Sequence, residues 1–232
     1  MESTVSLQGR WALVTGASRG VGRQIAKGLA QHGCNLILHA RRHHNLTQVA
    51  GELAESGVRV ELVGAELSEL TEVDRLWQQC LKLAPRIDVI YNNAGIQAPW
   101  HELHSTPIEE YYQSFAINVI ALVRICDYAL PLMKQQGFGR IINLTSGIEN
   151  LPQLMPYSVS KAAVDRYVRD FVPALKGTGV VMSLLDPGWC KTDLGSDAAP
   201  NEVESVLPGA LLPALLPNDA PSGQLFRAQD YR

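Results

Sequence analysis

The sequence lacks the features that mark several classes of protein. Its formal net charge is −3 and it contains no long basic run, so we expect no nucleic-acid partner. Charged residues make up only 19% of the chain and apolar residues 46%, a composition typical of a globular rather than a disordered protein. Because no run of 18 uncharged apolar residues occurs, we also expect no membrane association.

Cysteine is scarce, and the four cysteines are far apart. None has a C-x-x-C spacing or a nearby His/Cys cluster, which is typical of reduced cysteines in a cytoplasmic protein. The pair His43-His44 has no third ligand at a metal-binding spacing, so we predict no metal site. The segment Met1–Arg10 is polar and lacks the apolar core of a secretory signal. Together these absences favour a cytoplasmic protein without a metal.

What the sequence does contain is an alternation of short apolar runs and longer amphipathic stretches. This pattern is typical of βα units repeated around a parallel sheet. We predict strands over residues 11–15, 35–39, 59–63, 88–91, 140–144, 180–185 and 223–226. We predict helices over residues 21–31, 45–56, 71–83, 108–135 and 156–176. We expect Pro131 to kink the fourth helix and Pro173 to bend or end the fifth.

The predicted fold class is therefore α/β. Residues 1–232 are expected to form a single Rossmann-like, doubly wound domain. Its mostly parallel, seven-stranded sheet carries helices on both faces. Within this domain, the region 192–221 is rich in Pro, Ala and Leu but poorly periodic, and we predict a mobile flap with one short helix there.

A glycine-rich turn follows the first predicted strand. Thr15–Gly22 reads T-G-A-S-R-G-V-G and opens the first helix. Glycine there permits a tight turn and close approach of the backbone to a pyrophosphate, which the helix N-terminus stabilises. The spacing is G-x-x-x-G-x-G rather than G-x-G-x-x-G, and such a turn alone can be purely structural. At the first βα turn of a doubly wound fold, it predicts dinucleotide binding.

The same βα unit indicates which dinucleotide binds. NAD sites place an acidic residue near the end of the second strand, where it binds the ribose 2′-hydroxyl. This chain has Ala40-Arg41-Arg42 there and no acidic residue. Arg41 together with Arg19 can hold a 2′-phosphate, whereas we interpret Arg42 as a solvated residue at a helix start. The sequence therefore favours NADP(H) over NAD(H).

Tyr157 and Lys161 are one helical turn apart, so their side chains lie on one face of the predicted helix. A phenol with a pKa near 10 is a poor acid or base at neutral pH, and a nearby ammonium lowers that pKa. Pro156 places Tyr157 in the first turn, where the helix dipole acts in the same direction. The pair alone also fits an ordinary helix contact. In a dinucleotide-binding fold it predicts a proton-transfer site.

With these motifs in order, the chain resembles the short-chain dehydrogenase/reductase family over nearly its whole length. The matching positions are the cofactor loop T-G-x-x-x-G-x-G at Thr15–Gly22, the N-N-A-G turn at Asn92–Gly95, Asn118 in the long helix, Ser146 at the end of the fifth strand, Y-x-x-x-K at Tyr157–Lys161 and P-G-x-x-x-T at Pro187–Thr192. The resemblance implies an oxidoreductase that transfers a hydride between NADP(H) and a carbonyl or secondary alcohol substrate.

Four catalytic residues follow from this resemblance. Ser146 would hydrogen-bond the substrate oxygen, and Tyr157 would exchange a proton with that oxygen. Lys161 would lower the pKa of Tyr157 and bind the nicotinamide ribose. Asn118 would hold a water molecule that connects Lys161 to solvent; the alternative is a structural role in which Asn118 caps or bridges backbone. Thr145 competes with Ser146 for the role of the serine.

The resemblance also implies a set of cofactor-binding residues. They are Gly16, Ser18, Arg19, Gly20, Gly22, Arg41, Glu66, Leu67, Asn93, Ala94, Gly95, Tyr157, Lys161, Pro187, Gly188 and Thr192. Glu66 stands where the family often has an aspartate near the adenine. The resemblance further implies a homodimer or homotetramer, with subunits joined through the helices at 108–135 and 156–176. The apolar stripe Ala163, Tyr167 and Phe171 fits that interface and equally fits burial against the sheet.

The substrate side is less determined than the cofactor side. Ser146, Leu154 and Trp189 are the candidate substrate-binding residues, in surroundings that are apolar and have little fixed charge. The interval from Ser146 to Tyr157 is about two residues shorter than usual in the family. A ketone, an aldehyde, a secondary alcohol or a quinone would each suit such a site.

Two other functions share parts of this pattern. Sugar-nucleotide epimerases and dehydratases carry Y-x-x-x-K, but they normally have a larger carboxy-terminal substrate domain than the residues after Pro187 provide. A catalytically silent, NADP-binding redox sensor or scaffold of the same fold is the other alternative. Because all four catalytic positions are occupied, an enzyme is favoured over the catalytically silent alternative.

Overall fold

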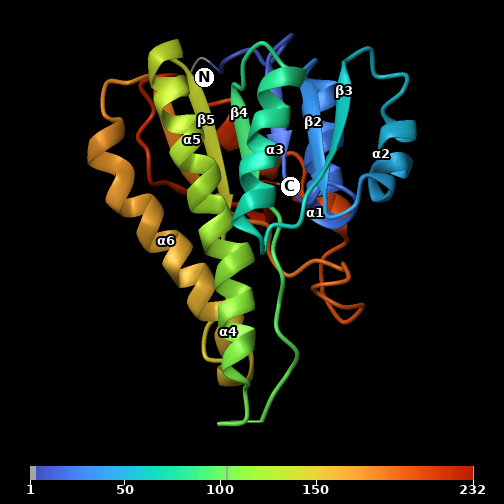
Figure 1. The fold of residues 1–232 in the computed structure, drawn as a ribbon, viewed down its shortest axis with the longest axis vertical. Coiled ribbons are helices and arrows are strands. Elements are labelled where there is room, and N and C mark those ends of the chain that lie inside the picture. Colours follow the sequence, from blue (N-terminus) through green and yellow to red (C-terminus); the bar gives the residue numbers. More distant parts are fainter. Residues whose placement is uncertain (1–3, 103, 232) are drawn as a thin grey trace.

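Seven strands form one sheet in which every neighbouring pair runs parallel (Figure 1). The computed structural model describes residues 4–102 and 104–231, so the first three residues of the segment considered for a signal lie outside it. The strands are β1 (Trp11–Val14), β2 (Asn35–Ala40), β3 (Val60–Gly64), β4 (Val89–Asn92), β5 (Gly139–Leu144), β6 (Val180–Asp186) and β7 (Leu225–Arg227). Their order is β3-β2-β1-β4-β5-β6-β7. The predicted α/β, doubly wound fold is confirmed.

Helices cover both faces of the sheet, because each helix buries one apolar side. On one face lie α1 (Gly20–Gln31), the short 3-10 helix η1 (His43–Leu46) and α2 (Thr47–Glu52). On the other lie α3 (Leu70–Leu83), α4 (Ile108–Phe115), α5 (Ala121–Gln136) and α6 (Met155–Leu175). A hydrophobic core lies on each face of the sheet, and successive residues of a strand point into one core and then the other. Leu13, for example, packs beneath α3–α6, whereas Val14 packs beneath α1.

The long helix has an irregularity that differs from the predicted one. α4 and α5 are joined by a π-helical turn, η2 (Ala116–Ile120), which contains Asn118. The helix then continues through the exposed Pro131 to Gln136, and α6 likewise continues through Pro173 to Leu175. Each proline removes only one backbone donor, and the buried face of each helix holds it in place despite that loss. The interruption of α-helical geometry therefore falls at Asn118.

By length and composition alone, the continuous helix Ile108–Gln136, with 29 residues, would pass as a membrane span. This is weak support for membrane association, because core helices of soluble proteins pass the same test. Here Ala121, Ile125 and Ala129 of this helix lie in the core beneath α3–α6.

The region predicted as a flap with one short helix is corrected. It contains two 3-10 helices, η4 (Val203–Val206) and η5 (Gly209–Ala214), and a further one, η6 (Ala228–Asp230), follows β7. Val206 and Leu211 belong to the core beneath α1. A side chain on Gly28 of α1 would begin only 2.7 Å from Leu211 Cδ1, so the two segments are in close contact. From Val203 onward, much of this region therefore packs against the rest of the domain.

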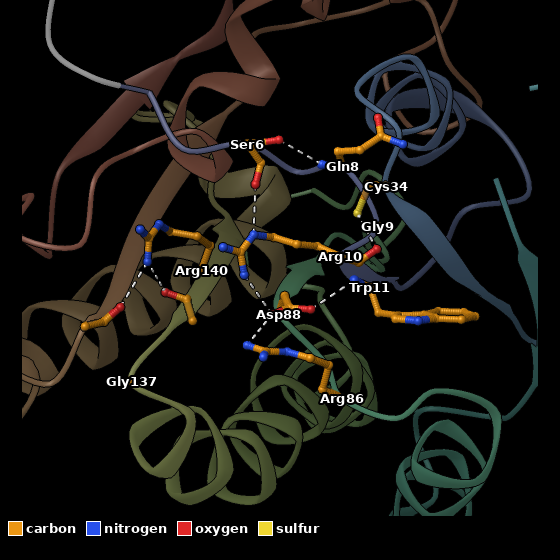
Figure 2. Close-up of polar contacts among 12 residues, drawn as sticks. Ser6, Gln8, Gly9, Arg10, Trp11, Cys34, Arg86, Asp88, Gly137 and Arg140 are labelled. Atoms are coloured by element: carbon orange, nitrogen blue, oxygen red, sulfur yellow. Dashed lines mark hydrogen bonds and ion pairs between the residues drawn. The ribbon is translucent and has the colours of Figure 1, made fainter. Parts of the chain in front are cut away.

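A polar network closes the amino-terminal edge of the sheet (Figure 2). Asp88 is fully buried just before β4. Its carboxylate accepts hydrogen bonds from the Trp11 amide at 3.1 Å and the Arg10 guanidinium at 3.1 Å, and it pairs with Arg86 at 2.6 Å. Two cations and one amide thus satisfy this buried charge.

Arg140 in β5 is also fully buried, but its described partners are carbonyl oxygens and an amide (Figure 2). It donates to the backbone oxygens of Leu216, Gly139 and Gly179 at 2.6–3.0 Å, and to Asn218 Oδ1 at 2.7 Å. Burial lowers its pKa to about 10. The guanidinium thereby fastens the chain before β7 to the amino-terminal edge of the sheet.

Candidate active site

The predicted functional residues gather at the opposite, carboxyl-terminal edge of the sheet. In an open parallel sheet this is the edge at which ligands bind, because the turns after the strands converge there. Figure 1 shows this edge at the bottom of the view, where α4 and the loop before it project past the sheet.

The glycine loop after β1 packs directly against the N-N-A-G turn after β4. Gly16 has φ +66°, a left-handed conformation, and a side chain there would begin 2.9 Å from Ala94 Cα. A side chain on Gly22 would begin 2.4 Å from Asn93 Nδ2. That amide nitrogen donates to the Thr15 and Gly16 carbonyls at 2.8 and 3.1 Å. Glycine is therefore required at Gly16 and Gly22 by contact between the two turns.

The start of α1 is arranged to bind an anion. α1 begins at Gly20, after Arg19, and none of the described side chains caps it. Its first turn contains no acidic residue. The free amide groups and the positive end of the helix dipole suit a pyrophosphate. Ser18 is partly exposed in the same loop.

Thr15, the first residue of the predicted loop, and His39, which sequence reasoning missed, hold this loop in place. Thr15 Oγ1 accepts hydrogen bonds from the Asn93 and Ala94 amides, both at 3.0 Å, and donates to the Tyr91 carbonyl at 3.2 Å. His39, at 1% exposure, accepts from the Gly16 amide through Nδ1 at 3.3 Å. Its position near the end of β2, beside the glycine loop, was the only available signal for this role.

His39 also reaches across to the chain after β3. Its Nε2 lies 3.0 Å from the Ala65 carbonyl oxygen, and its own carbonyl accepts from the Ala17 amide. A ring that accepts at Nδ1 and donates at Nε2 is the neutral tautomer. Burial lowers the His39 pKa, whereas the Ala65 carbonyl and the charge of Glu66 act to raise it. A neutral His39 thus links the glycine loop to the region expected to hold the adenine.

The residues predicted near the adenosine end are only partly brought together. Arg41 is exposed and lines a cavity of about 560 Å³ together with His43 and Lys82. Arg19 lies against Asp193 instead, with Nε 3.1 Å from the carboxylate, and both side chains are mostly exposed. Glu66 accepts a hydrogen bond from the Ser68 amide, and Leu67 is buried.

Tyr157 and Lys161 occupy the first two turns of α6, and both are buried. Lys161 Nζ lies 5.7 Å from the centre of the Tyr157 ring and donates to the Leu144 carbonyl at 2.8 Å. A side chain on Gly95 would begin 3.6 Å from Lys161 Nζ, so the ammonium also lies beside the N-N-A-G turn. The helix pair and the N-N-A-G turn therefore lie next to each other.

The pKa of Tyr157 moves in the opposite direction from the predicted one. Burial raises it, a hydrogen bond with Ser146 lowers it and the charge of Asp186 raises it, so that the pKa of Tyr157 is about 12. Burial also lowers the Lys161 pKa to about 8, against an opposing effect of Asp165. Desolvation of the phenol outweighs the hydrogen bond from Ser146, because the uncharged phenol is the favoured form in a buried site.

Asn118 has the bonds of a structural bridge. Its Oδ1 accepts from the Ile96 amide at 2.8 Å, and its Nδ2 donates to the Ile96 carbonyl and to Ser160 Oγ, each at 2.9 Å. The π-helical turn η2 aims Asn118 at the chain that follows the N-N-A-G turn, and such turns are frequent at functional sites. Asn118 thus joins that chain to α6, next to Lys161.

Of the two candidates after β5, Ser146 is the one that reaches the site. Ser146 is partly exposed, hydrogen-bonds Tyr157 and accepts from the Ile148 amide at 3.2 Å. Thr145 is buried, and its Oγ1 has no partner among the described residues. Thr192, at the far end of the P-G-x-x-x-T motif that starts at Pro187 and Gly188, approaches the glycine loop; a side chain on Gly20 would begin 3.3 Å from Thr192 Cγ2.

The candidate substrate residues are not gathered in one cavity. Leu154 is buried in the short 3-10 helix η3 (Pro152–Leu154), whereas Trp189 is 56% exposed and donates to the Gly195 carbonyl. A cavity of about 320 Å³ is lined by the loop before α6 and by Val159, and neither Leu154 nor Trp189 lines it. Across residues 4–102 and 104–231, no three His, Cys, Asp or Glu side chains come together as a metal site.

Known proteins are similar to this chain in sequence and in fold. The family model for short chain dehydrogenases matches residues 10–203. The hydroxynaphthalene reductase-like protein Arp2 of Metarhizium anisopliae is 32% identical over 212 residues, covering 90% of this chain and 78% of that protein. The chloroplastic NADPH-dependent aldehyde reductase-like protein of Arabidopsis thaliana is 32% identical over 216 residues, covering 86% and 80%.

Among solved structures, the 3-oxoacyl (acyl-carrier-protein) reductase of Agrobacterium tumefaciens with NADP bound has a TM-score of 0.86 at 25% identity, covering 96% of this chain and 93% of that one. The fold of this chain agrees with that of this solved structure. The chain therefore belongs to the short-chain dehydrogenase/reductase family of oxidoreductases.

Proposed function

We propose that this oxidoreductase transfers a hydride between NADP(H) and a carbonyl or secondary alcohol, with Tyr157 as the acid or base. The observation that carries the proposal is the convergence of the buried Tyr157 and Lys161 with the partly exposed Ser146 at the edge of the sheet where the glycine loop lies. The names of two relatives, one an NADPH-dependent reductase-like protein and one a reductase with NADP bound, support the choice of cofactor.

The chain's own residues fit the dinucleotide. The uncapped start of α1 would hold the pyrophosphate, and the close contact of Gly16 and Gly22 with the N-N-A-G turn keeps side chains out of that place. Arg41 would pair with the 2′-phosphate, and Thr192 and Lys161 would contact the nicotinamide half. The bound cofactor supplies the hydride chemistry.

The proton chemistry follows from the pKa values. With a pKa of about 12, Tyr157 is protonated at neutral pH and can donate its proton to the substrate oxygen as that oxygen gains negative charge. Ser146 hydrogen-bonds the same phenol and would also donate to the substrate oxygen. The Lys161 ammonium would stabilise the phenolate that remains. In the oxidative direction, the same groups act in reverse.

The test is NADPH oxidation over a panel of ketones, aldehydes and quinones, with wild type and Tyr157→Phe. We expect the variant to lose roughly 10²–10⁴-fold in rate, the usual contribution of a general acid. Tyr112→Phe is the matched control, since Tyr112 is 74% exposed on α4. Equal rates for wild type and Tyr157→Phe on every compound would contradict catalysis and favour the silent cofactor-binding alternative.

Cofactor choice is tested at Arg41. Loss of a charge-assisted contact with a 2′-phosphate costs about 1.5–3 kcal/mol, so Arg41→Ala should weaken NADPH binding roughly 10- to 100-fold in calorimetry. NADH binding should change little. The neighbouring, equally exposed Arg42→Ala is the control. Similar losses for NADPH and NADH would remove the argument for a 2′-phosphate site.

We further propose that the protein acts in the cytoplasm as a homodimer or homotetramer, with no nucleic-acid or membrane partner. Support comes from the exposed apolar side chains Ile108, Tyr112 and Ile120 on the long helix and Val159 on α6. Tyr167 and Phe171, by contrast, pack partly buried against the core. Light scattering on wild type and Tyr112→Glu tests the assembly, and a monomeric wild type would contradict it.

A further inference from the structure

An acidic residue lies at the catalytic edge without a role in the chemistry described above. Asp186 is the last residue of β6 and is partly buried. Its Oδ1 accepts a hydrogen bond from the Gly188 amide at 2.9 Å. Its Oδ2 lies 3.0 Å from the point where a side chain on Gly147 would begin, so the carboxylate points across to the turn that carries Ser146.

The charge of this carboxylate is not balanced by a cation within the part of the chain that the structure describes. Among the described residues, no Lys, Arg or His nitrogen forms an ion pair with Asp186. Its negative charge also acts on Tyr157, where it raises the pKa and so opposes formation of the phenolate. A partly buried carboxylate that disfavours the catalytic phenolate calls for a compensating positive charge in the assembled site.

We propose that Asp186 is the countercharge for the oxidised nicotinamide ring, and that it makes the site prefer NADP⁺ over NADPH. The inference rests on the proposed function, in which Lys161 and Thr192 contact the nicotinamide half and the next two residues, Pro187 and Gly188, belong to the cofactor-binding set that the family resemblance implies. The oxidised ring carries a positive charge and the reduced ring carries none. A fixed carboxylate therefore stabilises one form of the cofactor and not the other.

A preference of this kind acts on the direction of the reaction. An enzyme that binds NADP⁺ more tightly than NADPH shifts the equilibrium of its bound complex toward NADP⁺ and alcohol, the products of carbonyl reduction. Asp186 would thus be a positioning residue, which acts through its field on the cofactor rather than by contact with the reacting atoms.

The experiment measures the dissociation constants of NADP⁺ and NADPH by calorimetry for wild type, Asp186→Asn and Asp197→Asn. The asparagine at 186 keeps an oxygen for the Gly188 amide and removes only the charge. Asp197, exposed in the chain after Thr192, is the matched control. We expect Asp186→Asn to weaken NADP⁺ binding roughly tenfold, while NADPH binding changes less than twofold.

Two further variants keep the test decisive. Asp186→Glu retains the charge and should retain the preference for NADP⁺. Asp186→Ser removes the charge and should lose that preference, as Asp186→Asn does. Thermal melts confirm that each variant is folded. Equal weakening of both cofactors, or weakening in Asp197→Asn as well, would overturn the proposal. Unchanged affinities with a raised KM for substrate would overturn it too, in favour of a substrate contact. If wild type binds neither cofactor, the proposed function itself fails.

Discussion

Replacement of His39 by leucine tests how the glycine loop is held. Leucine has similar bulk but cannot accept from the Gly16 amide or donate to the Ala65 carbonyl. Leaving a buried donor or acceptor unpaired costs about 1–3 kcal/mol. With two such groups affected, we expect His39→Leu to lower the free energy of unfolding by about 2–4 kcal/mol at pH 7.5.

The loss should depend on pH in a direction set by the lowered pKa of His39. Below the unfolded-state value of about 6.5, the unfolded chain binds a proton on His39 that the folded protein does not. The stability that neutral His39 provides is therefore complete above about pH 6.5 and is lost as pH falls, by up to about 1.4 kcal/mol per pH unit. Glu66 is the charged group that acts on His39 and opposes this effect.

The assay is urea unfolding followed by circular dichroism at pH 7.5, 6.0 and 5.0. The difference in unfolding free energy between wild type and His39→Leu should shrink as the pH falls. His39→Asn, whose side-chain oxygen can still accept from the Gly16 amide, should lose less than the leucine variant. The exposed His32→Gln controls for loss of a histidine. A difference that is independent of pH, or smaller than 1 kcal/mol at pH 7.5, would refute the reasoning.

Two other predictions concern packing at the two edges of the sheet. Arg140→Met leaves the Leu216 carbonyl without its donor and removes one of the two donors to the Gly179 carbonyl, which keeps the Gly139 amide. The variant should lower the free energy of unfolding by about 3 kcal/mol without changing cofactor affinity; urea unfolding that shows a loss below 1 kcal/mol would count against this role. Gly22→Ala would place a carbon 2.4 Å from Asn93 Nδ2 and should destabilise by about 1–3 kcal/mol. Its control is Gly51→Ala in α2, where open space surrounds the glycine, and this variant should instead stabilise the protein by about 0.5–1 kcal/mol. Thermal melts in which both variants shift the melting temperature in the same direction would contradict the contact between Gly22 and Asn93.

The sequence was sufficient where structure depends on local pattern. Each of the seven strands overlaps the range predicted for it, and the buried strands β1 and β4 follow apolar runs because a strand covered on both faces is largely apolar. The start of α6 at Met155 lies one residue from the predicted start, since Pro156 favours the first turn. The glycine loop and the N-N-A-G turn meet because parallel strands bring their following turns to one edge.

What the sequence could not provide depends on contacts between distant segments. The bonds of His39 join β2 to the chains after β1 and β3, and no local pattern contains them. The π-helical turn at Asn118 depends on its partners at Ile96 and Ser160. The pKa of Tyr157 was predicted in the wrong direction because spacing reveals Lys161 but not the depth of burial, which dominates here. Val206 and Leu211 are core residues in 3-10 segments, where the period of 3.6 residues that marks helices is absent.

The contact between Gly22 and Asn93 has a consequence for engineering. Cofactor loops are often treated as portable modules that can be exchanged between enzymes. In this protein the loop is shaped jointly by Thr15, His39 and Asn93, which come from three different strand ends. A loop grafted from a relative would meet an amide that already fills the space beneath Gly22, so a successful transplant would have to carry the N-N-A-G turn and residue 39 with it.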